Sequence, residues 1–487
     1  MHTDHEIDTT EFELVSGLEI HVQLNTKSKI FCSDSAAYGA GPNEHISPVS
    51  LALPGALPKL NREVVAKAIR MGLALNCQVN QHNFFDRKNY FYADLPKGYQ
   101  ITQDRMPICG KGYLDVTLKD GSTSRIGINR IHLEEDAGKS IHDQDDKFSY
   151  IDLNRAGVPL IEIVTEPDIR SAEEAAALFS EIRKLVRHLD VSDGNMEEGS
   201  LRCDANISIR PQGEKTFGTR CEVKNLNSIR NVRRAIQHEF SRQERLIRSG
   251  GSVIQSTLNF DAEAGTTSPM REKEEANDYR YFADPDLQPV YISDAWLAEI
   301  RAAMPAMPEE LAAGLQQKYG LAAADALIIA RDADQYGYFL EGADLVQQPK
   351  ILANWMLGPV KSILNDREAD FNTFAVRPAR LAAVISLVES KKVTQNLAVQ
   401  KLLPAMAEAP DHDPAMLAEQ MNLLIVEDSD ELESFIAAVF EKFPAQVESF
   451  KKGKKGVLGL FVGEVMKLAK GKADPKTVNE KIISKLK

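Results

Sequence analysis

The sequence predicts an α+β domain followed by two all-α domains. Up to about residue 293, short runs with strand character follow one another without regular helical crossovers, which favours a largely antiparallel sheet over a doubly wound one. After Asp294 the chain changes to Ala- and Leu-rich stretches with helical spacing. At 487 residues the chain also exceeds the usual size of one core, so two or three domains are expected.

Apolar spacing locates two helices and four strands in the first part. Helical periodicity covers residues 63–75 and 172–189. Runs with strand character cover residues 126–133, 160–165, 201–209 and 220–224. We therefore expect the α+β domain at residues 1–294.

The rest of the chain is expected to be helical. Segments such as AWLAEIRAAM and EELAAGLQQKYG follow one another, which predicts an all-α domain at residues 295–408. The segment PDHDP at residues 410–414 is typical of a linker. Residues 409–487 are therefore expected to form a small α-helical tail domain.

Charge is unevenly distributed along the chain. The formal net charge is −13, which argues against nucleic-acid binding by the protein as a whole. Residues 220–250, however, hold eight Lys or Arg against three acids, and residues 441–487 hold twelve lysines against five acids. Such patches can bind RNA phosphates. A solvated helix face and a basic terminal tail explain the same composition, so composition leaves both readings open.

Composition also bears on the compartment. No apolar run approaches the roughly 20 residues that span a bilayer, and the polar first ten residues do not resemble a signal peptide. The five cysteines are too few and too scattered for a disulfide framework. We expect a cytoplasmic protein.

Residues 86–103 concentrate cations and aromatic rings. They read DRKNYFYADLPKGYQITQ, which fits neither a helical nor a strand period. We expect an ordered loop that lines a site, in which Lys and Arg meet phosphate and the rings pack against bases or sugars. A surface loop with its aromatic side chains tucked into the core is the alternative.

Charged residues recur at alternate positions of the expected strands, and side chains two apart on a strand share a face. The pairs are Glu19 with His21, His132 with Glu134, Asp204 with Asn206, and Glu222 with Lys224. Glu135 lies on the opposite face unless its strand ends earlier. Gathered carboxylates repel one another, so a divalent cation or a basic substrate is needed, and Mg²⁺ suits oxygen ligands. Unrelated surface acids are the alternative for any one pair.

Residues 229–248 predict an amphipathic helix with two unlike faces. The apolar face carries Ile229, Val232, Ile236, Phe240 and Ile247. The opposite face carries Arg230, Arg234, His238, Arg242 and Arg245. This basic face either is solvated or contacts RNA phosphates or a partner protein.

Together, five long motifs resemble a known family. They are GLEIHVQL (17–24), DRKNYFYADLPKGYQITQ (86–103), HLEEDAGKS (132–140), LRCDANIS (201–208) and DYRYFADPDL (278–287). In this order they are similar to the B subunit of the glutamine-dependent aspartyl/glutamyl-tRNA amidotransferases. The similarity runs from about Glu13 to the final lysines.

The resemblance implies a fold and an activity. The first domain would be a cradle similar to the catalytic fold of glutamine synthetase and guanidino kinases. With ATP and Mg²⁺ it would phosphorylate the side-chain carboxylate of Glu-tRNA(Gln) or Asp-tRNA(Asn), and ammonia would then displace phosphate. In such a heterotrimer, the amidase (A) subunit would supply ammonia from glutamine through a channel, and the small (C) subunit would bind the two together.

The resemblance also implies roles for single residues. Metal ligands or their immediate supports would be Glu19, His21, Glu135, Asp204 and Glu222, with Glu134 as the alternative to Glu135. The candidates for contacting ATP phosphates or the acyl phosphate are Arg87, Lys88, Lys97 and Lys224. Each of these could instead be a structural ion-pair partner, and His21 could be a core histidine. The tail lysines expected to bind tRNA are Lys454, Lys455, Lys467, Lys470 and Lys472, and recognition is expected to rest on shape and phosphate contacts as much as on bases.

The cysteines limit further chemistry. Some members of the family carry additional cysteines near Cys32 and around residues 45–51, and bind zinc there. Here that stretch reads HISPVSL, and one thiolate cannot form such a site, so no structural zinc is expected. Cys203 faces away from Asp204 on a strand, so burial is expected rather than a nucleophilic role. No amidase pattern is visible, which places glutamine hydrolysis in the amidase subunit.

Two rival functions follow from the same residues. The first is a non-catalytic subunit that docks tRNA and whose acidic cluster is structural. The second is a free-standing ATP-dependent carboxylate–amine ligase that acts on a small molecule. Both leave the resemblance along the whole chain unexplained.

Overall fold

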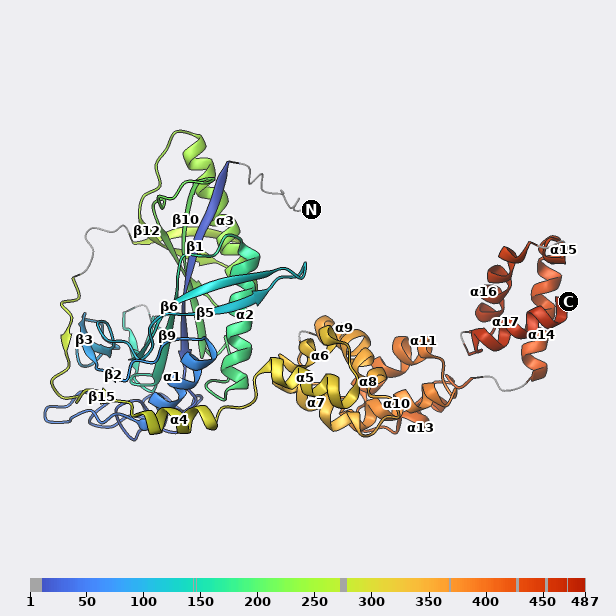
Figure 1. The fold of residues 1–487 in the computed structure, drawn as a ribbon, viewed down its shortest axis with the longest axis horizontal. Coiled ribbons are helices and arrows are strands. Elements are labelled where there is room, and N and C mark those ends of the chain that lie inside the picture. The colour runs from blue at the N-terminus through green and yellow to red at the C-terminus, as the bar shows by residue number, and fades with distance from the viewer. Residues whose placement is uncertain are drawn as a thin grey trace. The chain divides into compact units, whose positions relative to one another are not determined.

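The structure is a computed structural model that describes residues 11–142, 144–145, 147–271, 278–367, 369–425, 429–451, 454–470 and 472–486. The chain divides into two compact units, Met1–Pro305 and Ala306–Lys487, of which the first is α+β and the second all-α (Figure 1). The first unit continues past residue 294 because α4 (Asp294–Ala302) packs against α1 (Arg62–Ala74). There the Arg62 guanidinium lies 4.7 Å from the centre of the Trp296 ring.

An eight-stranded sheet forms the centre of the first unit. Its strands are β1 (Phe12–Gln23), β5 (Gly112–Thr117), β6 (Thr123–Glu135), β9 (Pro159–Thr165), β10 (Leu201–Pro211), β11 (Cys221–Leu226), β12 (Ser256–Asp261) and β13 (Thr266–Arg271). They lie in the order β13-β12-β11-β10-β1-β9-β6-β5, and neighbours are antiparallel except for β11 and β12. The expected largely antiparallel sheet is confirmed, and the four strand runs read from the sequence correspond to β6, β9, β10 and β11.

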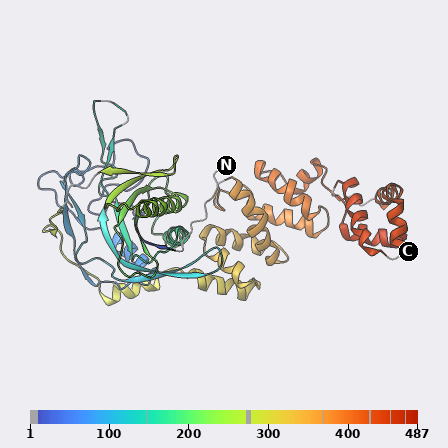
Figure 2. The ribbon, with the colours of Figure 1, turned by 90° about the horizontal axis from the view of Figure 1, so that it is seen from above.

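Two long helices, α2 (Ala172–His188) and α3 (Ile229–Arg248), cover one face of this sheet (Figures 1 and 2). Helix α2 packs against β1 and β5, and α3 packs against β10, β11 and β13. Helix α2 begins after Ser171, where the Ser171 hydroxyl accepts from the Glu174 amide and the Glu174 carboxylate accepts from the Ser171 amide. This capping box satisfies amides that the first turn leaves unpaired.

Burial alternates along β1. Leu18, Ile20 and Val22 are buried, whereas Glu19 and His21 between them are half-buried. Successive side chains of a strand point to opposite faces. The apolar set therefore lies under α2 and α3, and the charged set lies on the other face of the sheet.

The two ends of residues 86–103 are short strands that pair with each other as a hairpin. Strand β3 (Asp86–Asn89) pairs with β4 (Tyr99–Thr102), and β14 (Phe282–Ala283) adds to β3 on its other side. The expectation of a loop without strands is therefore wrong at both ends of the segment. Each strand has only four residues, too few for a two-residue period to be recognised. The remaining short pairs are β2 (His82–Asn83) with β15 (Val290–Tyr291) and β7 (Lys139–Ile141) with β8 (Tyr150–Asp152).

The second unit contains two hydrophobic cores. The first core is built by α5 (Pro308–Tyr319), α6 (Ala323–Ala330), α7 (Ala333–Ala343), α8 (Pro349–Trp355), α9 (Lys361–Asp366), α10 (Pro378–Glu389), α11 (Gln395–Leu397), α12 (Leu403–Glu408) and α13 (Pro414–Gln420), with π-helical turns at Met356–Val360 and Ala398–Leu402. The tail core is built by α14 (Ser429–Lys442), α16 (Leu458–Leu468) and α17 (Pro475–Leu486), with α15 (Pro444–Lys451) and a 3₁₀ turn at Lys455–Val457 beside them. Across the described ranges, every helix is too short or too polar to cross a membrane.

The expected linker at residues 410–414 does not separate these two cores. Helix α13 packs against α10, and Ala418 and Leu423 are buried in the first core. The Ile425 amide also donates to the Lys392 carbonyl at 2.9 Å. The change of core therefore falls between Ile425 and Ser429, later than position 409, because α13 buries its apolar side chains with the preceding helices.

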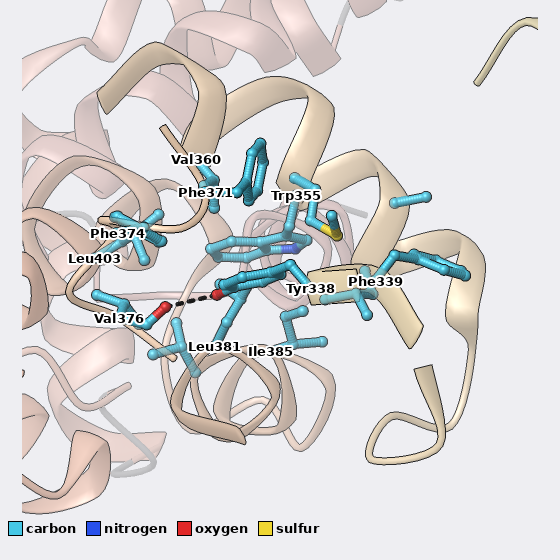
Figure 3. Packing of buried hydrophobic residues seen from close by; sticks show 14 of the residues in the cluster. Tyr338, Phe339, Trp355, Val360, Phe371, Phe374, Val376, Leu381, Ile385 and Leu403 are labelled. Carbon is cyan, nitrogen blue, oxygen red and sulfur yellow. Dashed lines mark hydrogen bonds between the residues drawn. The ribbon is translucent and has the colours of Figure 1, made fainter. Parts of the chain in front are cut away.

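Tyr338 lies inside the first core with its ring among apolar side chains (Figure 3). Its hydroxyl donates to the Val376 carbonyl at 2.7 Å, and its ring meets Phe371 edge-on with 5.2 Å between centroids. The hydrogen bond satisfies two polar groups that lie among apolar side chains.

Replacing this tyrosine tests the packing. Tyr338→Phe leaves the Val376 carbonyl without its donor, which should lower local stability by about 1–3 kcal/mol. Amides of α7 and α10 should then exchange with solvent faster, as measured by hydrogen–deuterium exchange on the full chain. Tyr291→Phe, at an exposed tyrosine of the first unit, is the control. Unchanged exchange in α7 and α10 would contradict the prediction.

Candidate active site

Charged side chains from five neighbouring strands share the sheet face opposite α2 and α3. Residues directly opposite each other in paired strands lie on the same face. The pairings are Glu222 with Asn206, Asp204 with Glu19, Arg202 with His21, His21 with Glu162, and Glu162 with His132. These pairs connect β11, β10, β1, β9 and β6, so the charged residues form one continuous polar band across the sheet.

Two histidines and two glutamates meet at one end of the polar band. We call His21, His132, Glu134 and Glu162 the histidine–glutamate cluster. His132 Nε2 lies 3.1 Å from Glu162 Oε2 and 3.5 Å from Glu134 Oε2. His21 Nε2 lies 3.4 Å from Glu162 Oε2 and 3.9 Å from Glu134 Oε1. Thr102 of β4 adds a hydrogen bond to Glu134 Oε2 at 3.2 Å.

Opposite charges stabilise the ionised forms in this cluster. Burial alone would lower the pKa of His132, but the charge of Glu162 and contacts with Glu134 raise it to about 9. Burial also opposes the charged form of His21, yet its contact with Glu162 raises its pKa. Burial would raise the pKa of Glu162, and the two histidines instead hold it well below its usual range. His132 is therefore protonated at neutral pH, and the contacts of His21 favour its protonated form, so the two histidines offset the negative charge of the carboxylates.

At the other end of the polar band, a lysine and not a histidine lies between the carboxylates. We call Glu19, Asp204, Asn206, Glu222 and Lys224 the lysine-centred cluster. Lys224 Nζ lies 2.9 Å from Asp204 Oδ2 and 2.8 Å from Glu222 Oε1. Asn206 Nδ2 donates to Glu19 Oε1 at 2.8 Å.

The charges of the lysine-centred cluster are not fully balanced. Burial alone would lower the pKa of Lys224, but Asp204 and Glu222 raise it. Burial raises the pKa of Glu19, and the negative charge of Glu162 adds to this effect. Glu19 is thus the carboxylate that gains most from an additional cation nearby.

Glu135 does not join either cluster. Its Oε2 lies 2.8 Å from Lys97 Nζ, and its Oε1 accepts from the Ile101 amide at 2.8 Å. The reason is that β6 continues through Glu135, so strand alternation places Glu134 beside His132 and turns Glu135 away. The alternative position, Glu134, is the one that meets His21.

The cations of the β3–β4 hairpin are engaged by groups within the first unit. Arg87 Nε lies 2.8 Å from Asp284 Oδ2, and Arg87 Nη2 lies 2.8 Å from Asp286 Oδ2. Its guanidinium lies 4.2 Å from the centre of the Tyr99 ring. Lys88 Nζ lies 4.9 Å from the centre of the Tyr279 ring. Arg87 thus makes structural ion pairs, the alternative expected for these cations, and Lys88 makes cation–π contacts.

The basic residues of α3 belong to a helix that packs against the sheet face opposite the polar band. Helix α3 buries Val232, Ile236 and Phe240, as the two-faced pattern predicted. On its basic side, Arg242 Nη2 contacts Glu239 Oε1 at 2.6 Å and Arg234 Nη1 donates to the Ala262 carbonyl at 2.6 Å.

In the tail, four of the five predicted lysines are exposed and Lys472 is half-buried. The exposed residues are Lys454, Lys455, Lys467 and Lys470. Lys467 Nζ contacts Glu464 Oε1 at 2.7 Å. Gly453, the first residue of the GKKG segment, lies outside the described residues.

The cysteines are buried or half-buried. Cys203 is 1% exposed on the face opposite Asp204, as expected for burial. Burial raises the pKa of Cys203 well above its usual range and that of Cys77 to about 12. Cys32 Sγ lies 3.6 Å from Ser50 Oγ, and Ser50 donates to Asp34. These contacts hold Cys32 among oxygen atoms of neighbouring side chains.

Sequence reasoning missed two residues of the histidine–glutamate cluster. His132 was placed on the right face but given no role, and Glu162 was not considered. Glu162 is the single charged residue in the apolar run LIEIV at residues 160–164. A lone acid at the middle of an apolar strand is the signal that could have identified it, because such a residue needs a partner.

The donor set fits a divalent cation. Oxygen atoms of Glu134 and Glu162 and a nitrogen atom of His21 all lie within 4.8 Å of one another. Opposite ligands of Mg²⁺ or Ca²⁺ lie about 4–5 Å apart, so one ion can contact all three. A bound metal would take over the charge balance that protonated His21 and His132 otherwise provide.

Comparison with known proteins identifies the family. Residues 14–298 match the GatB/GatE catalytic domain, and residues 337–486 match the GatB domain. The chain belongs to the GatB family. Three relatives, each named as the B subunit of an aspartyl/glutamyl-tRNA(Asn/Gln) amidotransferase, match it over 98% of its length and 99% of theirs. They come from Nitratidesulfovibrio vulgaris (47% identical), Solidesulfovibrio magneticus (48%) and Pseudomonas fluorescens (46%).

The two matched GatB regions contain different parts of the predicted site. The polar band lies within the GatB/GatE catalytic domain. The tail lysines at residues 454–472 lie within the GatB domain. The polar band and the basic tail thus lie in separate parts of this GatB-family chain.

Removing one carboxylate tests the charge balance. Glu162→Gln leaves burial as the main influence on His132, so the pKa of His132 should fall well below about 9. The measurement is a titration of histidine-labelled, metal-free protein by NMR. Glu166→Gln, on the segment that follows β9, is the matched control and should leave His132 unchanged. A His132 pKa that stays near 9 in Glu162→Gln would refute the assignment of Glu162 as its main partner.

Proposed function

We propose that this chain is the component of a tRNA-dependent amidotransferase that activates and amidates an amino acid attached to tRNA. The γ-phosphoryl group of ATP moves to the side-chain carboxylate of Glu-tRNA(Gln) or Asp-tRNA(Asn), which releases ADP. Ammonia then attacks the acyl phosphate and displaces phosphate, leaving Gln-tRNA(Gln) or Asn-tRNA(Asn). The observation that carries this proposal is the polar band, because it lies in the part of the chain that matches the GatB/GatE catalytic domain.

The fold supports a cradle for this chemistry. We propose that the first unit is related to the catalytic fold of glutamine synthetase and guanidino kinases. One face of its largely antiparallel sheet packs against helices, and the other carries charged side chains from five adjacent strands. Phosphoryl transfer depends mainly on positioning and charge neutralisation, which such a face can supply without a protein nucleophile.

Two sets of residues would hold Mg²⁺ and ATP. Residues proposed to bind the metal or support its ligands are Glu19, His21, Glu134, Glu162, Asp204 and Glu222. When bound, Mg²⁺ would neutralise the phosphate oxygens and the developing charge on the leaving group. Glu135, held by Lys97, is proposed to fix the end of β4 beside this site and not to bind metal.

Lys224 is the best-placed cation for a phosphate. Two of its three N–H donors face Asp204 and Glu222. The third can donate to a phosphate oxygen while the first two keep the lysine in place. Lys97 is held by one carboxylate, that of Glu135, and is the second candidate for contacting phosphate, whereas the contacts of Arg87 and Lys88 favour positioning of the hairpin.

The partners follow from the reaction. We propose that the chain works with an amidase (A) subunit, which releases ammonia from glutamine, and with a small (C) subunit. We propose that the tail, with its core from Ser429 onward, binds tRNA. The five cysteines are free thiols, which supports a reducing, cytoplasmic setting.

The decisive experiment uses the chain purified together with the amidase and small subunits. With Mg²⁺, ATP, glutamine and Glu-tRNA(Gln) or Asp-tRNA(Asn), Gln or Asn should appear on the tRNA, and omission of ATP should abolish it. Asp204→Asn removes a carboxylate that faces Lys224 and should reduce amide formation by at least roughly 10- to 100-fold. The control is Asp120→Asn, at the exposed β5–β6 turn.

Retention of tRNA by Asp204→Asn would show that the loss concerns chemistry. Full activity of Asp204→Asn would favour a protein that only docks tRNA and has a structural acidic cluster. Amide formation on a small acid without tRNA would favour the free-standing ligase.

The tail lysines can be tested separately. Lys454→Ala combined with Lys455→Ala removes two exposed cations, so tRNA affinity should fall and its dependence on salt should weaken by about 0.7–0.9 in log–log slope per lost phosphate contact. The control combines Lys119→Ala with Lys147→Ala, two exposed lysines of the first unit. The measurement is tRNA binding to the complex at several salt concentrations. Equal affinity and slope in both double variants would disprove a role for this pair.

A further inference from the structure

Arg202 of β10 lies on the polar band but belongs to neither cluster. It is directly opposite His21 of β1, and Asp204 follows two residues later on the same face. Burial opposes protonation of His21, its contact with Glu162 raises its pKa, and the charge of Arg202 acts against that rise. The guanidinium is therefore near the histidine–glutamate cluster, while its strand continues into the lysine-centred cluster.

Asp136 holds this guanidinium in place. Arg202 Nη2 donates to Asp136 Oδ2 at 2.9 Å, and Gln23 Nε2 donates to the same oxygen at 2.8 Å. Asp136 is 5% exposed, and its backbone forms hydrogen bonds with Val158 and Gly157. An arginine anchored in this way has its planar head group oriented before any ligand arrives.

Asp136 pairs with only part of the head group. A guanidinium has five N–H donors in one plane, and among the described residues only Nη2 of Arg202 has a partner. The Nε atom is buried without a hydrogen-bond partner in the same part of the chain. The side chain is 33% exposed, so part of it is open to solvent. Arg202 is thus a positioned but incompletely satisfied cation on the polar band.

The place of Arg202 suits the acyl substrate better than the nucleotide. In-line transfer puts the attacking and leaving oxygens on opposite sides of the transferred phosphorus. Lys224, the best-placed cation for a phosphate, contacts Asp204, whereas Arg202 lies one cross-strand pair further along β1. A planar guanidinium also matches the two oxygens of a carboxylate, whereas a lysine acts as a point charge.

We propose that Arg202 binds the side-chain carboxylate of the aminoacyl group on tRNA, with Asp136 as its positioning residue, an inference that rests on the proposed function. One carboxylate oxygen attacks the γ-phosphorus of ATP, and the bond from this phosphorus to the bridging oxygen of ADP breaks. The other oxygen stays at Arg202 and becomes the carbonyl oxygen of the acyl phosphate.

The same N–H donors then serve the second step. When ammonia attacks the carbonyl carbon, negative charge develops on the oxygen that Arg202 already holds, and the guanidinium stabilises it. The bond to phosphate breaks as the amide forms, and phosphate leaves with the proton that the nitrogen loses.

The test uses the chain assembled with the amidase and small subunits, with an ammonium salt in place of glutamine so that the amidase reaction is not needed. Arg202→Met should slow formation of Gln-tRNA(Gln) or Asn-tRNA(Asn) by about 10- to 100-fold, the loss expected for a hydrogen bond between charged groups. The affinities for Mg-ATP and for uncharged tRNA should not change. Arg202→Lys should recover only part of the rate, because lysine keeps the charge but not the planar fork. Arg210→Met, which removes an ion-paired arginine on the same strand and face, is the matched control.

Two further measurements separate carboxylate binding from a structural role. Methylguanidinium added to Arg202→Ala should restore part of the lost rate, which a defect in folding would not allow. Asp136→Asn should be slower than the wild type. Its combination with Arg202→Met should be no slower than Arg202→Met alone, because Asp136 acts through Arg202.

Each other outcome overturns the assignment. An unchanged rate in Arg202→Met would show that Arg202 does not hold the carboxylate. Weaker Mg-ATP binding in this variant would place Arg202 at the nucleotide phosphates. An equal loss in Arg210→Met would assign the effect to ion pairs that stabilise β10. A wild-type complex that forms no amide would instead contradict the proposed function itself.

Discussion

The register of β1 with its two neighbours determines where the charged side chains of the candidate active site lie. Glu19 is opposite Asp204 on one side, and His21 is opposite Glu162 on the other. A shift of one residue would turn the whole polar set toward α2 and α3 and expose the apolar set. Burial of Leu18, Ile20 and Val22 under the helices therefore fixes the arrangement of the charged face as well as the core.

Charge balance is the second constraint on this face. Carboxylates from several strands meet in a half-buried setting, where unpaired charges are unfavourable. Two histidines balance one end, and Lys224 offsets part of the negative charge at the other. A divalent cation can bind here because its positive charge can take the place of the protein cations that now lie beside the carboxylates. Lys224 can in turn face the phosphates of a nucleotide. The same reasoning explains why Arg87 is a weaker candidate, since two aspartates already hold it.

Sequence alone predicted those features that depend on local periodicity. The α+β class, helices α1 to α3 and the shared face within each strand pair, such as Glu19 with His21 and Asp204 with Asn206, all follow from spacing of two or about 3.6 residues. Features that depend on distant contacts were missed. The β3–β4 hairpin is supported by β14, which lies far along the chain, and α13 joins a core whose other members precede the linker. Glu162 escaped notice because its partners come from two other strands. The choice between Glu134 and Glu135 required the exact end of β6.

Three of the four buried thiols of the first unit are those of Cys77, Cys109 and Cys203. Their pKa values are raised by burial, so at neutral pH they are protonated and shielded from reagents. Cys109 also fits so closely against Gly72 that an added Cβ there would lie 2.3 Å from its sulfur. Alkylating reagents can reach these sulfurs only when the surrounding structure opens. The first unit therefore carries native reporters whose labelling rate counts its opening events, without any introduced probe.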